Sequence, residues 1–389
     1  MTDEKKFDLI PEAATVVEIK KSIPPDAATV LENQTPAPSK PPGVITGVLQ
    51  HATEALPSID VPPHAARQLE RSPTPTPSPT ETTAPRIGEY ALIARFPSSS
   101  AADVFLGYKV AQFGYIRRAV VKWTGSDRED FRMRRQSLLD EARAISFVDH
   151  PNIVTLLDVA DTSSGTYFAV EYVAGTDLRR VLTTLAEREE RLPFELSCFL
   201  ACEVLRGLEY VHTARGADGQ PLDIVHRDVN PSNVLVSEDG HVKLTDFGTV
   251  LMQGRMQDAT APGMVKGKVR YLAPEYIADQ TCTKSVDLYS VGAMLFEMVT
   301  GRPCFSGNTN ASIMMRIVRD GLPYQELVDA NVPEGLASIV MRATARHADE
   351  RYPTATDLVH ALESYLLESS AFVSPSTLGT YMHAHALFV

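Results

Sequence analysis

The sequence has few cysteines, and their spacing is not that of a metal site or a disulfide framework. Only Cys198, Cys202, Cys282 and Cys304 occur among 389 residues, and none belongs to a CxxC pair. Small secreted domains need many closely spaced cysteines, and structural zinc sites need paired ones. We therefore expect reduced thiols and a cytoplasmic protein.

Long apolar runs and an excess of positive charge are also missing. The first ten residues, MTDEKKFDLI, lack the apolar stretch of a signal peptide, and the longest apolar candidate, VGAMLFEMVTG, is interrupted by Glu297. A membrane helix needs ~20 apolar residues, so we expect no membrane span. The formal net charge of −12 gives no overall field that favours an anionic membrane surface, DNA or RNA, so no nucleic-acid partner is expected.

Proline is abundant at the N-terminal end of the chain. Fifteen of the 27 prolines precede Ile87, and residues 71–86 read RSPTPTPSPTETTAPR. Because no sustained apolar periodicity occurs there, residues 1–86 are predicted to be a disordered or extended arm. We favour a solvated linker; the alternative is a docking or phosphorylated arm that has a regulatory partner.

The chain after residue 86 begins with short runs that are typical of β-strands. These runs alternate and carry β-branched and aromatic residues, whereas one charged stretch places Leu138, Ala142 and Ile145 on one face of a helix. The sequence predicts strands over 90–96, 103–110, 117–123, 153–161 and 166–173, and a helix within 130–148. We expect an antiparallel sheet with this helix packed on it.

The second half of the chain has helical periodicity. Residues 193–214 place Leu200, Val204 and Leu208 on one stripe, and Cys198 and Cys202 are best interpreted as small core residues of this helix. Short strands are predicted at 233–236 and 241–247, followed by helices within 286–300, 310–320, 334–344 and 355–368. The fold class is therefore α+β, with a small β-rich lobe and a larger helical lobe.

Three motifs in order resemble the signature set of the protein kinase superfamily, and specifically bacterial Ser/Thr kinases of the eukaryotic type. They are HRDVNPSN at 226–233, DFG at 246–248 and APE at 273–275. The resemblance implies a bilobal protein kinase domain over residues 87–368. It leaves residues 369–389 as a short tail, either a helix on the large lobe or a docking element.

By this resemblance, five residues handle the charge of Mg-ATP. Lys122 would contact the α and β phosphates and pair with Glu141, which lies nineteen residues later on the predicted helix. Asp228 would orient the acceptor hydroxyl as the catalytic base, and Asn233 and Asp246 would bind Mg²⁺. Simple loop-capping roles for Asp228 and Asn233 would leave their coincidence with Asp246 unexplained.

The resemblance also implies residues for adenosine and for the architecture. The backbone of Glu171 and Val173 would bind adenine, Val170 is at the gatekeeper position, and Asp177 would meet the ribose or the substrate. The remaining matches look structural: a buried His226, a Glu275 salt bridge with Arg351, and Asp287 as the anchor of the catalytic loop.

Two departures from the family pattern concern phosphate binding. The glycine loop GxGxxGxV falls on PSSSAADV, so Pro97, Ser99 and Ala102 replace its glycines while Val104 is retained. Weaker nucleotide binding or a stiffer loop is expected from this change.

The second departure lies in the catalytic loop. Asn230 stands where Ser/Thr kinases have a lysine, and Lys268 stands where the activation segment usually has a threonine. Our hypothesis is that Lys268 reaches back to replace the missing cation; the alternative is an ordinary solvated lysine.

The activation segment carries one further expectation. Arg227 beside Asp228 suggests regulation by a negative charge, and Thr260 is the mid-segment hydroxyl, so it is the predicted phosphosite. The basic residues of the segment, Lys266, Lys268 and Arg270, could equally serve acidic substrates.

The sequence thus predicts a Ser/Thr protein kinase that transfers the γ-phosphate of Mg-ATP to protein hydroxyls, including its own. The competing hypothesis is a pseudokinase that serves as a nucleotide-binding or protein-binding scaffold, because the glycines are lost. A small-molecule kinase is disfavoured, since the long segment that ends in APE is typical of a platform for protein substrates.

Overall fold

The computed structural model describes residues 85–96, 102–216, 218–247 and 268–388, which all belong to one unit of the chain. Most of the predicted arm therefore lies outside the described residues. The same is true of three predicted site residues and of one basic residue of the activation segment: Pro97, Ser99, Thr260 and Lys266.

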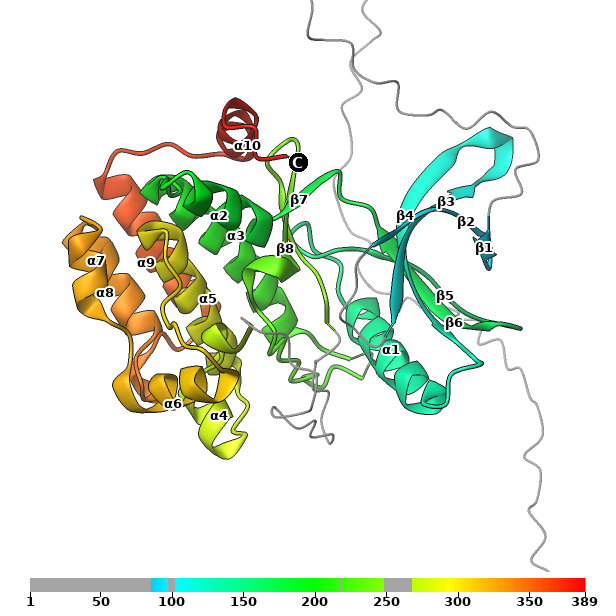
Figure 1. Ribbon diagram of the computed structural model, residues 1–389, viewed down its shortest axis with the longest axis horizontal. Helices are drawn as coiled ribbons and strands as arrows, with labels where there is room; N and C mark the ends of the chain where they lie inside the picture. Colours follow the sequence, from blue (N-terminus) through cyan, green and yellow to red (C-terminus); the bar gives the residue numbers. More distant parts are fainter. Residues whose placement is uncertain (1–84, 97–101, 217, 248–267, 389) are drawn as a thin grey trace, which may run out of the picture. The chain divides into compact units, whose positions relative to one another are not determined.

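The first part of this unit is an antiparallel sheet, as predicted (Figure 1). Its strands lie in the order β1-β2-β3-β4-β6-β5. They are β1 (Arg86–Ile87), β2 (Tyr90–Phe96), β3 (Asp103–Val110), β4 (Ile116–Gly125), β5 (Leu156–Thr162) and β6 (Gly165–Glu171). A single helix, α1 (Phe131–Ser146), packs against β4, β5 and β6.

The alternation of side chains along β4 places its lysine. Ala119 and Val121 are buried in a small cluster on one face of the sheet. Lys122 points to the opposite face, where Ala142 and Ile145 of α1 pack with Phe168 of β6. Strand β4 therefore places the Lys122 ammonium between the sheet and α1.

The second part is helical and holds most of the core. Its helices in the described residues are α2 (Leu178–Glu187), α3 (Phe194–Thr213), α4 (Pro274–Asp279), α5 (Lys284–Thr300), α6 (Asn310–Asp320), α7 (Tyr324–Asp329), α8 (Glu334–Ala343), α9 (Ala355–Glu368) and α10 (Pro375–Ala384). None of these helices has the length and apolarity needed to cross a membrane. All four cysteines are free thiols.

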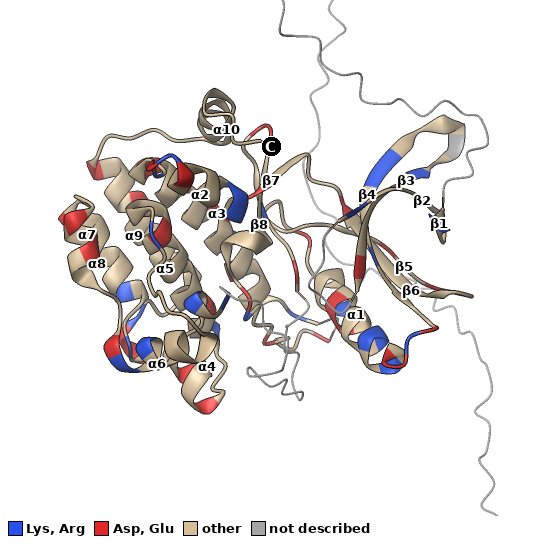
Figure 2. Ribbon diagram, viewed as in Figure 1, with Lys and Arg blue, Asp and Glu red and all other residues tan. Residues whose placement is uncertain are grey.

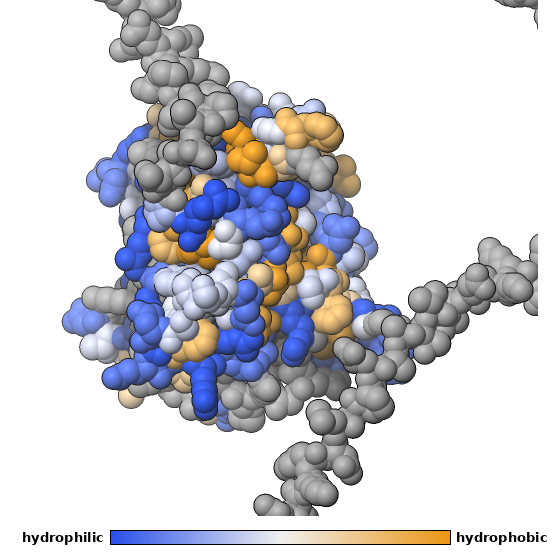
Figure 3. Space-filling view, turned by 90° about the vertical axis from the view of Figure 1, so that its right-hand side faces the viewer, coloured by the Kyte–Doolittle hydropathy of each residue, from blue (hydrophilic) through white to orange (hydrophobic). Residues whose placement is uncertain are grey.

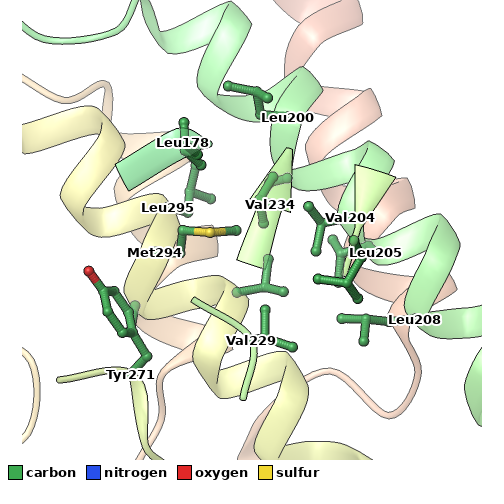
Figure 4. Close-up of a cluster of buried hydrophobic side chains, with 14 of the residues drawn as sticks. Leu178, Leu200, Val204, Leu205, Leu208, Val229, Val234, Tyr271, Met294 and Leu295 are labelled. Atoms are coloured by element: carbon green, nitrogen blue, oxygen red, sulfur yellow. The ribbon is translucent and has the colours of Figure 1, made fainter. Parts of the chain in front are cut away.

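Side chains of this core hold the catalytic loop in place. Figure 4 shows Val229, which lies within the loop, and Val234, which follows it, among side chains of α3 and α5. Both valines are buried, as are Val204 and Leu208 of α3 and Leu295 of α5. Because packed side chains resist displacement, the polar residues between the two valines are held in place.

A three-stranded sheet connects the loop to the DFG motif. It contains β7 (Gly175–Asp177), β8 (Val234–Ser237) and β9 (Val242–Leu244), in the order β7-β8-β9. Val234 pairs with Leu244, and the Thr245 amide donates to the Asn233 carbonyl at 2.9 Å. The open end of the β8–β9 hairpin therefore brings Asn233 beside Asp246.

The tail, for which the sequence left two possibilities, contains a helix that packs on this hairpin. Leu378 and Met382 of α10 are buried in the main core, and Arg188 donates to the His385 carbonyl at 2.7 Å. Gly240, at the β8–β9 turn, has φ of +80°, and a Cβ there would lie 1.8 Å from the Pro375 carbonyl oxygen. Only glycine fits this contact.

Gly240→Ala is expected to lower the free energy of unfolding by ~2 kcal/mol, because it adds a clash with α10 to an unfavourable backbone conformation. Chemical denaturation of both proteins measures this difference. Gly219→Ala is the matched control, since Gly219 has φ of +76° but a Cβ added there would meet no described atom within 4 Å. Equal losses for the two variants would refute the close contact with α10.

Candidate active site

Lys122 and Glu141 form the ion pair expected between the sheet and α1. The Lys122 ammonium lies 2.5 Å from Glu141 Oε1, and both residues are buried. The ammonium also lies 5.5 Å from the centre of the Phe168 ring. A buried ammonium needs such partners, so α1 fixes the position of this cation.

Asp246 is the second partner of Lys122. Its carboxylate accepts a hydrogen bond from the Lys122 ammonium. Burial opposes the charge on Lys122, but attraction to Asp246 and Glu141 outweighs burial and raises the pKa of the lysine. Burial likewise opposes the charge on Asp246, and Lys122 more than compensates, so the pKa of Asp246 is lowered. Both groups are charged at neutral pH.

Asp228 lies at the centre of a hydrogen-bond cluster in the catalytic loop. Asn230 Nδ2 donates to Asp228 Oδ1 at 2.9 Å, and Asn233 Nδ2 donates to Asp228 Oδ2 at 2.9 Å. The Asn230 side-chain oxygen accepts from the Ser232 amide at 3.0 Å, which caps the short turn Pro231–Asn233. Asn230 therefore orients the aspartate and the loop but contributes no positive charge.

Lys268 brings a positive charge into contact with Asp228. Its ammonium lies 2.6 Å from Asp228 Oδ2, and the lysine and aspartate side chains are 28% and 21% exposed. Lys268 begins a short 3-10 turn, Lys268–Tyr271, that precedes α4. Lys268 therefore contacts the proposed catalytic base, and its replacement of the missing catalytic-loop cation stays a proposal.

The backbone of the loop is held by Asp287 at the start of α5. Asp287 accepts from the amides of His226 at 2.9 Å and Arg227 at 2.8 Å, and it contacts His212 Nε2 at 2.8 Å. Burial raises the pKa of Asp287, but these hydrogen bonds outweigh burial and the pKa is lowered. His226 is fully buried, and its ring packs against Phe247 in a tilted arrangement with ring centres 4.6 Å apart. Burial lowers its pKa, which suits a structural histidine.

Two residues of the site adopt left-handed backbone conformations. Arg227 has φ of 65° and Asp246 has φ of 63°. Such conformations are unfavourable for residues with a Cβ, and they occur where the surrounding structure enforces them. Arg227 is also buried, and among the described residues its Nε and Nη2 atoms have no hydrogen-bond partner.

Most of the residues predicted to meet the nucleoside lie in β6 and in the chain from β6 to α2. Val170 is buried in β6, Val173 packs against the core after β6, and Glu171 pairs with Lys243 at 2.7 Å. Asp177 caps α2 by accepting from the Arg180 amide at 3.0 Å. Val104 of β3 pairs with Lys122 of β4, and Ala102 immediately precedes β3.

The APE motif, at the start of α4, is anchored by a second buried ion pair. Arg351 makes two bonds of 2.7 Å to the carboxylate of Glu275, and its side chain is fully buried. A neighbouring cluster was not predicted from the sequence: Arg179 and Glu297 pair at 2.7 Å, and both bond to the Tyr271 hydroxyl. The sequence did contain an indication of this cluster, because Glu297 interrupts an apolar helix and a buried carboxylate needs a partner.

Two candidate oxygen donors for a hard cation, Asn233 and Asp246, lie at the open end of the β8–β9 hairpin. In the described part of the chain, no group of three or more His, Cys, Asp or Glu side chains is placed to hold a metal ion. Asn233 and Asp246 supply one amide and one carboxylate, and one lysine faces two carboxylates there. This donor set fits Mg²⁺, which commonly binds one or two carboxylates together with substrate phosphates and water.

Comparison with known families identifies the class of the protein. The protein kinase domain family model matches residues 107–363, which include the paired lysine, the catalytic loop and the helices up to α9. The chain therefore belongs to the protein kinase domain family, and its fold is the bilobal α+β fold of that family.

Bacterial kinases are among the relatives of the chain. The chain is 29% identical over 301 residues to the tyrosine-protein kinase MasK of Myxococcus xanthus, an alignment that covers 77% of this chain and 46% of MasK. It is 30% identical over 275 residues to the serine/threonine-protein kinase PrkC of Bacillus subtilis, with 70% and 39% covered. It is also 30% identical over 275 residues to the serine/threonine-protein kinase PknL of Mycobacterium tuberculosis, an alignment that covers 71% of this chain and 65% of PknL. The chain thus spans less than half of the first two relatives.

Proposed function

We propose that the chain is a Ser/Thr protein kinase that transfers the γ-phosphate of Mg-ATP to protein hydroxyls, including its own. The observation that supports this proposal is the set of contacts around Asp228 and Asp246, in which the proposed base, the proposed metal-binding pair and two lysines come from four separate segments. Phosphoryl transfer depends mainly on positioning and on neutralising charge, and this site provides both.

Each residue has a role in this proposal. Lys122 binds the α and β phosphates, and Glu141 holds it there. Asn233 and Asp246 would hold Mg²⁺, which supplies charge neutralisation at the phosphates. Asp228 orients the acceptor hydroxyl and accepts its proton, and Lys268 offers a positive charge to the γ-phosphate. Arg227, with two unpartnered nitrogens among the described residues, would bind phosphorylated Thr260.

A pseudokinase scaffold remains the competing function, because Pro97, Ser99 and Ala102 replace the glycines of the phosphate loop. The intact pairs of Lys122 with Glu141 and with Asp246 favour the enzyme, since a scaffold has no need of this charge arrangement. The names of the relatives include both acceptor classes, so the acceptor must be measured.

Transfer of labelled γ-phosphate from ATP to the chain itself and to a basic protein, with and without Mg²⁺, tests the proposal. The expected product contains phosphoserine or phosphothreonine and forms only with Mg²⁺. Nucleotide binding without any transfer would favour the scaffold. Phosphotyrosine as the sole product would refute the Ser/Thr assignment, but the chain would still be a protein kinase.

A further inference from the structure

The end of the β3–β4 hairpin exposes a cluster of large apolar side chains that the proposed kinase reaction does not use. Phe113 is 94% exposed, Tyr115 is 74%, Val110 is 53% and Ile116 is 44%. Val110 and Ile116 are cross-strand partners, and Phe113 and Tyr115 lie between them in the sequence, so the four residues share one end of the hairpin. We call residues 110–116 the hairpin tip.

The backbone of the tip presents Phe113 to solvent. Phe113 has φ of 64° and ψ of 16°, a left-handed conformation that is unfavourable for a bulky residue. The side chain is almost fully exposed, so packing within the described chain does not compensate for this conformation. Exposed apolar clusters of this kind commonly mark an interaction surface.

The charge around the tip is opposite in sign to that of the whole chain. The stretch YKVAQFGYIRR, residues 108–118, contains three cations and no carboxylate, although the chain has a net charge of −12. Lys109 pairs with Glu89, whereas Arg117 and Arg118 are exposed on β4 directly behind the tip. Figure 2 shows blue stretches on β3 and β4 next to the tan end of the hairpin.

We propose that the hairpin tip binds the surface of a lipid bilayer that contains anionic headgroups. Phe113, Val110 and Ile116 would enter the boundary between headgroups and acyl chains, with Tyr115 at the headgroup level. Arg117 and Arg118, one and two residues beyond Ile116, would then meet lipid phosphates.

The order of residues along the hairpin favours a bilayer over an acidic protein. The apolar side chains form the extremity and the guanidinium groups stand behind them, which is the order of depth in a membrane interface. An acidic protein surface would instead place the cations at the contact and leave Phe113 without an apolar environment. Figure 3 views this side of the molecule and shows that orange, apolar residues reach the surface in its upper part.

Sedimentation of the full chain with vesicles tests the proposal. Vesicles of phosphatidylcholine with phosphatidylserine should bind the chain, vesicles of phosphatidylcholine alone should bind it far less, and high salt should release it. The double variant Phe113→Ser/Tyr115→Ser should lower the partition coefficient ~10-fold. Arg117→Glu/Arg118→Glu should lower it by a similar factor, ~10-fold or more.

Phe372→Ser is the matched control, because Phe372 is 89% exposed in the segment before α10 and should not affect vesicle binding. None of the tip residues belongs to the proposed active site, so phosphate transfer to a soluble protein should be unchanged in every variant. Thermal unfolding should confirm that the variants fold, since the changes remove exposed side chains. No binding that depends on phosphatidylserine, or binding that the tip variants leave unchanged, would overturn the proposal.

Discussion

Replacement of Asp228 by Asn is expected to lower the rate of phosphate transfer by ~10³-fold, which is within the usual contribution of a positioned acid or base. Asparagine keeps the size of the side chain, and its oxygen can still accept from Asn233 and Lys268, although the bond from Asn230 to the side chain is lost. The bonds from Asn230 and Asn233 to the backbone carbonyl of residue 228 remain, so the loop should keep its shape. Asparagine cannot accept the proton of the acceptor hydroxyl. Rates of labelled-phosphate transfer at saturating Mg-ATP measure the effect.

Nucleotide affinity separates this effect from a loss of structure. Asp228 contacts Asn230, Asn233 and Lys268, whereas Lys122 forms a separate set of ion pairs with Glu141 and Asp246. The variant should therefore bind Mg-ATP within a few-fold of the unmodified chain. A variant that retains full activity would show that Asp228 is not the base.

Lys268→Ala is expected to reduce turnover by ~10²-fold, the usual loss when one charge that stabilises a transition state is removed. The lysine is the cation in contact with Asp228, and Asn230 carries no charge that could replace it. Stability should change little, because the pair is partly exposed and such pairs contribute ~0–1 kcal/mol. Steady-state rates with a basic protein substrate measure the loss.

Lys284→Ala is the control for this prediction. Lys284 is an exposed lysine at the start of α5, sixteen residues later in the chain. It should have no effect on turnover. If the two alanine variants are equally active, Lys268 is an ordinary surface lysine.

Much of the fold could be predicted because its long elements have a clear periodicity. The predicted strands over 90–96 and 103–110 and helices over 310–320 and 355–368 agree with β2, β3, α6 and α9 at both ends. The elements that were not predicted are mostly short, such as β7 with three residues and α4 and α7 with six each. Short elements depend on tertiary contacts, which a local pattern does not report.

Helix α10 illustrates the same limit. Its sequence, PSTLGTYMHA, contains a central glycine, which weakens a helix by ~1 kcal/mol relative to alanine. In the structure, a Cβ at Gly379 would lie 3.0 Å from the Glu238 carbonyl oxygen, so the glycine permits the close approach to the β8–β9 turn. The local sequence shows the weakness of the helix but not the contact that offsets it.

The residues of the active site could be predicted where they belong to short motifs in a known order. Contacts between residues far apart in the sequence were harder to predict. The absence of a lysine at Asn230 is visible in the sequence. The contact between Lys268 and Asp228 joins residues forty positions apart and depends on where the activation segment ends. Arg179 and Glu297, 118 residues apart, meet only because α2 and α5 pack around Tyr271.

The most direct test of the account moves the cation back to the catalytic loop. Labelled-phosphate transfer should be measured for the unmodified chain, for Lys268→Thr and for Lys268→Thr/Asn230→Lys. We predict an active chain, a loss of ~10²-fold in the single variant and recovery of most of that loss in the double variant. An inactive unmodified chain, or a single variant as active as that chain, would contradict the claim that this protein is a kinase whose catalytic cation is Lys268.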